Sequence, residues 1–441
     1  MRQSSIKVLV FPGGTEIGLE IARALRYSKH FTPVGVNSEP DVSEIVYPEI
    51  VLGAPYAASC ELPDYILRLC RQRSVEIVMP AHDEAIAALV PLRAEGLTVV
   101  GPREDLGLIL RSKSRTYDAL SPAPFVPRRI DRANQPASAF PLFARPDRGQ
   151  GSVGARMISN EADLHAALSK TNPDLVTEYL PGAEYTVDCF STADGRLVFH
   201  APRERLRTRH GIAVRTRAVS DSDEFKAIGE TINAKLAPAG AWFYQAKRDG
   251  EGRLKLMEVA NRIAGTSGYN RLRGVNLVEM ALFQAIGTPV APPSALAPAS
   301  FIFERSLAEH IKWDRQAVDR VYVDFDDTLV FEDGRLNHEL VGLLYGLRAN
   351  LRTDIVLITR HQYEIEPKLA HLGLRGLFSE IVHLRNGEPK AGAIDARGVV
   401  VFIDDSFEER RAVSAAHASV TCLGPESASL LAGALAGGGY D

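Results

Sequence analysis

Cysteine is scarce in this sequence. The 441 residues include four cysteines, and no two of them have the C-x-x-C spacing of zinc or redox sites. This scatter excludes a disulfide framework and a structural zinc site of the usual spacing. Reduced, scattered thiols are typical of a cytoplasmic protein. The four residues are Cys60, Cys70, Cys189 and Cys422.

The sequence also lacks an excess of either charge and any long apolar run. It holds 51 basic and 55 acidic residues, for a net charge of −4. Nucleic acids and anionic membranes attract a surplus of cations, so we expect neither as a partner. No run approaches the roughly 20 apolar residues of a membrane span. The opening residues lack the apolar core of a secretion signal, which again predicts a cytoplasmic protein.

Short apolar runs do occur, and they alternate with segments of helical periodicity. Alternation of this kind predicts parallel sheets covered by helices, and the length predicts more than one domain. A Pro- and Ala-rich stretch at 289–298 marks a domain boundary. The clearest runs lie at 6–11, 33–36, 77–80, 98–100, 321–324, 355–359, 381–384 and 399–404.

The run at 321–324 ends at the carboxylate of Asp324. A second carboxylate, Asp326, follows two residues later, and Thr328 two residues after that. Transfer of a phosphoryl group to a carboxylate needs a nucleophile, a second acid or base, and a cation. Asp324 is the candidate nucleophile. Asp326 is the candidate that protonates the leaving oxygen and then activates water.

Candidates for the remaining roles also follow predicted strands. Thr359 can donate a hydrogen bond to phosphate, and Lys390 can neutralise its charge. Asp404 and Asp405, together with Asp324 and Asp326, offer the hard oxygen ligands that Mg²⁺ prefers. Because the carboxyl ends of parallel strands share one edge of the sheet, we expect all of these residues to meet there.

These four motifs, in this order, resemble the haloacid dehalogenase superfamily. The resemblance covers the last quarter of the chain and implies a Mg²⁺-dependent phosphohydrolase that acts on a phosphate ester. The short gaps between the motifs leave no room for a large cap domain. A capless Rossmannoid domain at 319–441 is therefore expected. A non-catalytic scaffold is the alternative that the complete motif set disfavours.

A second chemistry lies upstream, in a glycine-rich loop at 143–154. Glycines let backbone N–H groups close on phosphate, and a cation such as Arg145 balances its charge. A plain glycine-rich hairpin is the other interpretation. Three further segments decide between the two, at 112–117, 175–188 and 254–262.

Together these segments resemble the ATP-grasp superfamily, in its carbamoyl-phosphate-synthetase-like branch. The resemblance implies that ATP and Mg²⁺, with Mn²⁺ as an alternative cation, are the cofactors. Arg262 would stabilise the phosphoryl group in flight. The metal-binding strand reads E-V-A-N-R where E-x-N-P-R is usual, so Asn261 is displaced by one position. The implied nucleotide residues are Lys113, Arg145, Ser152, Glu178, Leu180 and Glu184, and the implied metal ligands are Gln245, Glu258 and Asn261.

The first 105 residues resemble the domain that precedes ATP-grasp modules. Gly13, Gly14 and Gly18 can also be interpreted as a dinucleotide fingerprint, with Glu39 or Asp41 on the ribose, but a full G-x-G-x-x-G is missing. For His82, which follows a strand, contact with substrate and capping of a helix are equal alternatives.

Arginines alternate along 203–209, which on a strand places all four on one face. Like charges on one face repel each other unless anions or acidic side chains lie opposite them. Nucleic acid could supply the anions, but pairing with acidic side chains of the same protein is the commoner arrangement.

We therefore predict an α/β chain that contains two activities. It comprises a Rossmann-like pre-ATP-grasp domain at 1–105, an ATP-grasp domain at 106–288, a linker at 289–318 and the phosphatase-like domain. The expected reactions are ATP-dependent ligation of a carboxylate to an amine through an acyl phosphate, and hydrolysis of a phosphate ester. The alternative is a phosphatase whose ATP-grasp part only senses nucleotide. A homodimer is expected from base rates alone.

Overall fold

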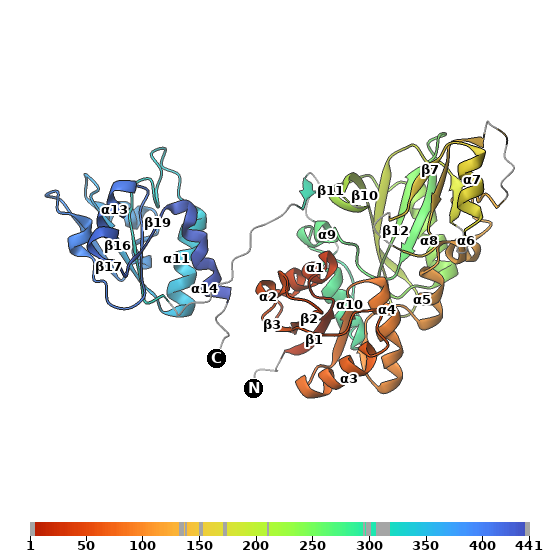
Figure 1. Cartoon of the computed structure of the whole chain (residues 1–441), viewed down its shortest axis with the longest axis horizontal. Coiled ribbons are helices and arrows are strands. Elements are labelled where there is room, and N and C mark those ends of the chain that lie inside the picture. Colours follow the sequence, from red (N-terminus) through yellow and green to blue (C-terminus); the bar gives the residue numbers. More distant parts are fainter. Residues whose placement is uncertain are drawn as a thin grey trace. The chain divides into compact units, whose positions relative to one another are not determined.

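The computed structural model describes residues 5–131, 136, 139–149, 153–170, 174–209, 211–293, 296, 301–305 and 318–436. The chain divides into two compact units, Met1–Leu307 and Ala308–Asp441. Figure 1 shows the first from red to green and the second in blue. The finer division into four segments stays a prediction.

The first unit begins with a five-stranded parallel sheet of order β3-β2-β1-β4-β5. Its three central strands are apolar and mostly buried, as parallel strands between helical layers must be. The strands are β1 (Ile6–Phe11), β2 (Phe31–Val36), β3 (Glu49–Val51), β4 (Ile77–Pro80) and β5 (Thr98–Val99). The helices that accompany them are α1 (Glu16–Leu25), α2 (Ser43–Val46), α3 (Leu62–Arg73), α4 (Asp83–Leu89) and α5 (Glu104–Leu110).

The glycines after β1 are explained by close packing. A Cβ on Gly14 would lie 1.6 Å from Oδ2 of Asp41, and one on Gly18 would lie 2.4 Å from the carbonyl oxygen of Gly13. The Asp41 carboxylate therefore occupies the space above Gly14.

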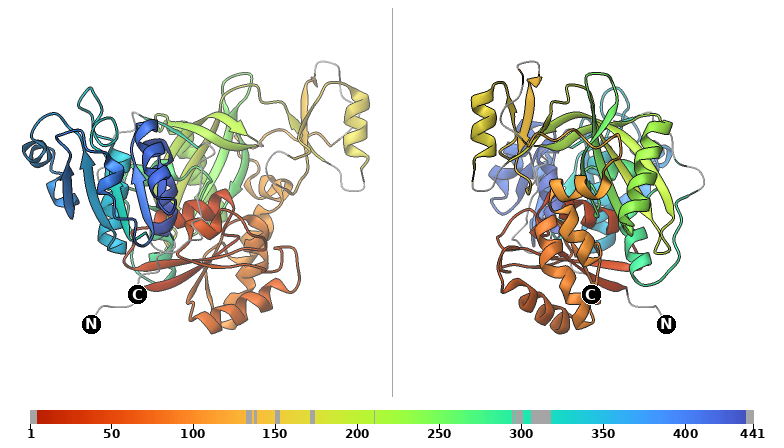
Figure 2. Two further views of the ribbon diagram at one scale, coloured as in Figure 1. Left: turned by 60° about the vertical axis from the view of Figure 1, so that its left-hand side comes forward. Right: turned by 90° about the vertical axis from the view of Figure 1, so that its right-hand side faces the viewer.

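A six-stranded antiparallel sheet of order β13-β12-β9-β10-β11-β14 forms the centre of the first unit. A smaller sheet of order β7-β6-β8, accompanied by α7 (Glu161–Leu168), stands apart from the N-terminal sheet (Figure 2). The strands of the large sheet are β9 (Glu184–Ser191), β10 (Leu197–Arg209), β11 (Ile212–Ala218), β12 (Gly240–Arg248), β13 (Leu254–Ala260) and β14 (Ile302–Glu304). Those of the small sheet are β6 (Leu142–Arg145), β7 (Arg156–Ile158) and β8 (Leu175–Glu178).

Strand β14 falls within the segment predicted as a linker. It pairs with β11 in the register Thr216↔Phe303, so this part of the segment belongs to the sheet. The remaining helices of the first unit are α6 (Lys113–Leu120), α8 (Asp223–Leu236), α9 (Gly268–Leu272) and α10 (Leu277–Ala285).

The second unit is built on a parallel five-stranded sheet of order β17-β16-β15-β18-β19. Its strands are β15 (Arg320–Val323), β16 (Asp354–Thr359), β17 (Glu380–His383), β18 (Val400–Ile403) and β19 (Thr421–Leu423). Its helices are α11 (His338–Leu351), α12 (Ile365–His371), α13 (Phe407–Ala416) and α14 (Ala432–Ala436). Both units mix helices with sheets, which confirms the predicted α/β class.

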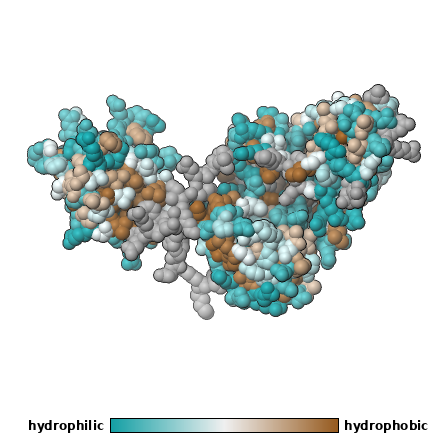
Figure 3. Space-filling model, in the orientation of Figure 1, coloured by the Kyte–Doolittle hydropathy of each residue, from teal (hydrophilic) through white to brown (hydrophobic). Residues whose placement is uncertain are grey.

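Hydrophilic residues cover much of the face of each unit seen in Figure 3, with hydrophobic residues gathered over smaller areas. In the described part of the chain, no helix has both the length and the apolar character needed to cross a membrane.

Candidate functional sites

A cavity of about 530 Å³ opens in the first unit. That volume is within the range of pockets that hold small molecules and cofactors. Side chains from the N-terminal sheet domain, the small sheet and the large sheet all line it. Six of the predicted site residues are among them: Lys113, Arg145, Glu184, Gln245, Glu258 and Arg262.

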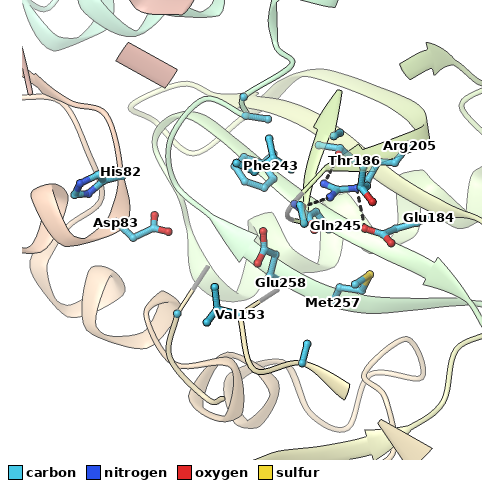
Figure 4. Close-up of a pocket in the computed structure, with 18 of the residues that line it drawn as sticks. His82, Asp83, Val153, Glu184, Thr186, Arg205, Phe243, Gln245, Met257 and Glu258 are labelled. Atoms are coloured by element: carbon cyan, nitrogen blue, oxygen red, sulfur yellow. Dashed lines mark hydrogen bonds and ion pairs between the residues drawn. The ribbon is translucent and has the colours of Figure 1, made fainter. Parts of the chain in front are cut away.

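The two predicted metal ligands of the large sheet lie opposite each other. Gln245 on β12 is in register with Glu258 on β13 and, on its other side, with Thr186 on β9. Side chains directly opposite on adjacent strands share one face of the sheet. Figure 4 shows Gln245 and Glu258 both facing the cavity. Their oxygens are hard ligands, so this pair fits Mg²⁺.

Two cations stand where the small sheet meets α6. Nζ of Lys113 donates to the carbonyl oxygen of Gly149 at 3.0 Å, and an Nη of Arg145 donates to that of Met257 at 2.9 Å. Burial lowers the pKa of Lys113, and the neighbouring Arg145 lowers it further. An anion placed between two such cations would relieve their repulsion. The donor set therefore fits the phosphates of a nucleotide.

Arg262 reaches the cavity from the end of β13. Its guanidinium forms two hydrogen bonds with the Asp83 carboxylate, at 2.7 and 3.1 Å, and lies 5.2 Å from the ring centre of Phe243. Burial lowers the pKa of Arg262, but the charge and hydrogen bonds of Asp83 and the charge of Glu258 together outweigh burial, and the pKa is raised. Arg262 therefore stays charged, and Asp83 fixes its direction.

Three of the four alternating arginines are paired with acids. Arg205 lies 2.7 Å from Glu184 at the cavity, and Arg207 lies 2.5 Å from Glu304. Arg203 is fully buried and donates to both carboxylate oxygens of Asp188, at 2.6 and 3.1 Å. For these three residues the structure favours acid pairing over a nucleic-acid surface.

Other predicted residues lie away from the cavity lining that the structure describes. Oε1 of Glu178 accepts a hydrogen bond from the Arg128 backbone at 2.8 Å, and Leu180 lies in the following loop. The Asn261 amide donates to the carbonyl oxygens of Ala239 and Ala241, at 2.9 and 3.0 Å, while its own oxygen has no hydrogen-bond partner among the described residues. Asn261 therefore braces the backbone. Ser152 lies outside the described residues.

The structure shows His82 as a helix cap, and contact of its ring with substrate stays a prediction. Its Nδ1 accepts a hydrogen bond from the Ala85 backbone at 3.0 Å, which caps α4. The same ring lines the cavity beside Asp83 (Figure 4).

A second polar cluster lies in the second unit, where the adjacent strands β15 and β18 end and where Lys390 begins a short 3-10 helix. Nζ of Lys390 lies 2.7 Å from Asp324 and 2.7 Å from Asp404. Asp324, Asp404 and Asp405 each offer one oxygen, and these oxygens lie within 4.8 Å of one another. Burial raises the pKa of Asp324 to about 6, although Lys390 opposes this. Three clustered carboxylates, two of them buried, fit a divalent cation.

Asp326 is not in that carboxylate group. Its carboxylate lies 2.9 Å from Nδ1 of His361, and the hydroxyl of Thr359 accepts the backbone N–H of His361 at 3.1 Å. The structure thus brings Asp324, Lys390, Asp404 and Asp405 together and directs Asp326 toward His361. Thr359 is buried at the end of β16.

Mg²⁺ binding at the carboxylate group is expected to depend on pH. The Asp324 carboxyl carries a proton below about pH 6, and a bound cation must displace that proton. Calorimetry on the Glu258→Gln protein should show that the affinity for Mg²⁺ falls about tenfold for each unit by which the pH drops below 6. Above pH 6 the affinity should level off. An affinity that is constant through pH 6 would contradict the raised pKa.

Two residues of these sites were not singled out from the sequence: Phe243, which lines the first cavity, and His361, which contacts Asp326. Asp83 and Arg205 also line the cavity, and both belong to segments that the sequence marked as able to face substrate, 80–84 and 203–209. The ion pair of Asp83 with Arg262 was not predicted. For His361 the signal was its nearness in sequence to Thr359. Nothing in the sequence paired His361 with Asp326.

The comparisons with known proteins concern the ATP-grasp resemblance. A family model described as "ATP-grasp in the biosynthetic pathway with Ter operon" matches residues 170–302. Comparison of the sequence with curated proteins gives no match. The family-model match supports an ATP-grasp domain in the chain.

Solved structures support the same fold. One is the biotin carboxylase domain dimer of Hydrogenobacter thermophilus 2-oxoglutarate carboxylase, in complex with MgADP, ADP and bicarbonate. Its TM-score is 0.54 at 18% sequence identity, and the match covers 65% of this chain and 71% of that one. N5-carboxyaminoimidazole synthetase from Staphylococcus aureus, complexed with ADP, has a TM-score of 0.55 at 15% identity, covering 67% and 80%. The biotin carboxylase from Campylobacter jejuni, in a β,γ-ATP complex, has a TM-score of 0.54 at 16% identity, covering 66% and 73%.

None of these reported matches names a phosphohydrolase. The haloacid-dehalogenase-like assignment of 319–441 therefore stays a prediction. Taken together, the family model and the neighbouring structures support an ATP-grasp domain in this chain, and the neighbours show its fold.

Proposed function

We propose that the first unit is an ATP-dependent ligase that joins a carboxylate to an amine or a related nucleophile. The observation that carries this proposal is the convergence on one cavity of the Gln245–Glu258 pair with Lys113, Arg145 and Arg262. The carboxylate and amide oxygens suit Mg²⁺, and the cations suit phosphate oxygens. The neighbouring structures contain ADP or an ATP analogue, which supports the same ligand here.

The proposed reaction has two steps. A carboxylate oxygen of the acid attacks the γ-phosphorus of ATP, and the bond between that phosphorus and the bridging oxygen of ADP breaks. The nucleophile then attacks the acyl carbon, and phosphate leaves. Lys113 and Arg145 hold phosphate oxygens. Arg262, held by Asp83, balances the charge on the phosphoryl group while it is transferred. A Mg²⁺ ion on Gln245 and Glu258 would neutralise charge on the phosphates.

We further propose that the second unit hydrolyses a phosphate ester. In this proposal Asp324 acts as the nucleophile. Lys390, which pairs with Asp324 and Asp404, balances the charge of the phosphoryl group. An Asp324 oxygen attacks phosphorus, and the ester oxygen leaves with a proton from Asp326. Water then attacks the same phosphorus and releases phosphate and the free carboxylate. A Mg²⁺ ion held by Asp324, Asp404 and Asp405 would offset the repulsion between nucleophile and phosphate.

The ligase proposal is tested by ADP release. The Asp324→Asn protein, used to silence ester hydrolysis, is supplied with MgATP and with pools of amino acids and small carboxylic acids. We expect ADP release only when both an acid and an amine are present. No ADP from any pool, alongside strong ester hydrolysis by the unchanged protein, would favour the nucleotide-sensing alternative.

Replacing Lys113 by Ala should weaken ATP binding roughly 10- to 100-fold, because a charged hydrogen bond to a phosphate oxygen is lost. Lys170→Ala provides the control, since Lys170 pairs with Asp174 and is not among the described residues that line the cavity. Calorimetric titration with ATP compares the two variants with the parent. Equal affinities in all three proteins would remove Lys113 from the nucleotide site.

A further inference from the structure

Two large aromatic side chains stand exposed in the segments that follow the two strands next to β15 in the second unit. Tyr363 is 70% exposed and lies in the loop after β16, and Phe407 is 68% exposed and begins α13 after β18. Strands β16 and β18 are the two neighbours of β15, which leads directly into Asp324. The segments that carry the two aromatic rings therefore flank the candidate nucleophile.

The backbone that carries these rings is well held. Arg360, in the loop with Tyr363, forms a 2.8 Å ion pair with Glu409 on α13. The ring of Tyr363 lies 6.0 Å from the ring of His361, edge to face, and His361 itself contacts Asp326. The ion pair connects the two segments, while the aromatic side chains stay largely open to solvent.

Exposed aromatic rings at a reaction site have a physical use. Single exposed apolar residues are common on protein surfaces and need no explanation. Here, however, two of the three large hydrophobic residues exposed among the described residues of this unit lie at the same edge. The third, Tyr345, is 39% exposed and donates its hydroxyl to the carbonyl oxygen of Gly373. Aromatic rings are good stacking partners for flat ligands.

We propose that the phosphate ester of the second unit carries a planar aromatic group, a nucleobase or an aryl ring, which stacks on Tyr363 or Phe407. This inference rests on the proposed phosphatase function, and it adds the substrate class. Lys390 would hold the phosphoryl end, and the aromatic residues would select the leaving group. Tyr363 and Phe407 thus determine specificity without taking part in bond cleavage.

The test compares uridine 5′-monophosphate with ribose 5-phosphate, which differ by the base alone. A pyrimidine is chosen because the first unit is proposed to bind adenine. In the full-length Asp324→Asn protein with Mg²⁺, we expect calorimetry to show roughly 5- to 100-fold tighter binding of the nucleotide. Tyr363→Ala or Phe407→Ala should remove most of this preference and leave ribose 5-phosphate binding unchanged. Tyr345→Ala is the matched control and should keep the preference.

Turnover is measured separately with the catalytically intact protein. The phosphatase function and the aromatic binding site can then be overturned independently of each other. Preference for the nucleotide in kcat/KM, lost in Tyr363→Ala or Phe407→Ala, would support the proposal. Preference for 4-nitrophenyl phosphate would identify an aryl ligand only if the same substitutions remove it, because 4-nitrophenolate is also the better leaving group. Selective binding without hydrolysis would overturn the phosphatase and keep the aromatic site. Equal binding of both esters by the parent, or no effect of either substitution, would overturn the aromatic site. Because both residues are exposed, each variant should melt within a few degrees of its parent.

Discussion

Hydrolysis of phosphate esters is expected to fall by on the order of 10³-fold or more in the Asp324→Asn protein. The amide cannot form the aspartyl phosphate, so the two-step route is lost. The substitution also leaves Lys390 with Asp404 as its only acid partner at this cluster among the described residues. Release of phosphate from the ester series used above, with excess Mg²⁺, measures the change.

Asp333→Asn is the matched control for this variant. Asp333 lies in the loop that follows the Asp324 motif, but it is exposed and pairs with Arg335 at 2.6 Å. We expect its hydrolysis rate to stay within a few-fold of the parent, because exposed ion pairs contribute little. Hydrolysis that persists in Asp324→Asn at the parent rate would exclude Asp324 as nucleophile.

ATP turnover in the first unit is expected to fall roughly 10²- to 10³-fold in Glu258→Gln. Glu258 is the charged member of the pair formed with Gln245, and its replacement removes the one full negative charge that this pair offers to a cation. ADP release under the pooled-substrate conditions measures the loss. Melting temperatures of variant and parent should agree closely, because the side chain changes neither size nor shape.

Glu204→Gln on strand β10 provides a control on the same sheet. Glu204 pairs with Arg217 at 2.8 Å and is not among the described residues that line the cavity. Its replacement should leave ADP release nearly unchanged. Similar losses in Glu204→Gln and Glu258→Gln would indicate damage to the sheet and would remove Glu258 from its proposed role.

The α/β class and the approach of the second unit's acids were predictable from sequence because both follow from local rules. Apolar runs that alternate with helical segments imply parallel sheets, and the strands of a parallel sheet end at one edge. Asp324 and Asp404 follow two such strands, so their meeting at Lys390 required no knowledge of side-chain detail.

Long-range pairing is what the sequence could not supply. Asp83 and Arg262 lie 179 residues apart, and no periodicity connects them. His361 was overlooked because its contact with Asp326 depends on how two loops fold over the sheet. The packing of Asp41 over Gly14 could not be predicted either, since a glycine in a loop suits a turn, a phosphate or a close neighbour equally well.

The first unit is proposed to activate a carboxylate with ATP as an acyl phosphate. The direct measurement uses the acid identified by ADP release, labelled with ¹⁸O in its carboxylate, and the Asp324→Asn protein to prevent secondary hydrolysis. Mass spectrometry of the released phosphate should find one ¹⁸O atom transferred from the acid for each ADP formed. Phosphate free of the label, with the labelled oxygen retained in the product or lost to AMP, would contradict the claim.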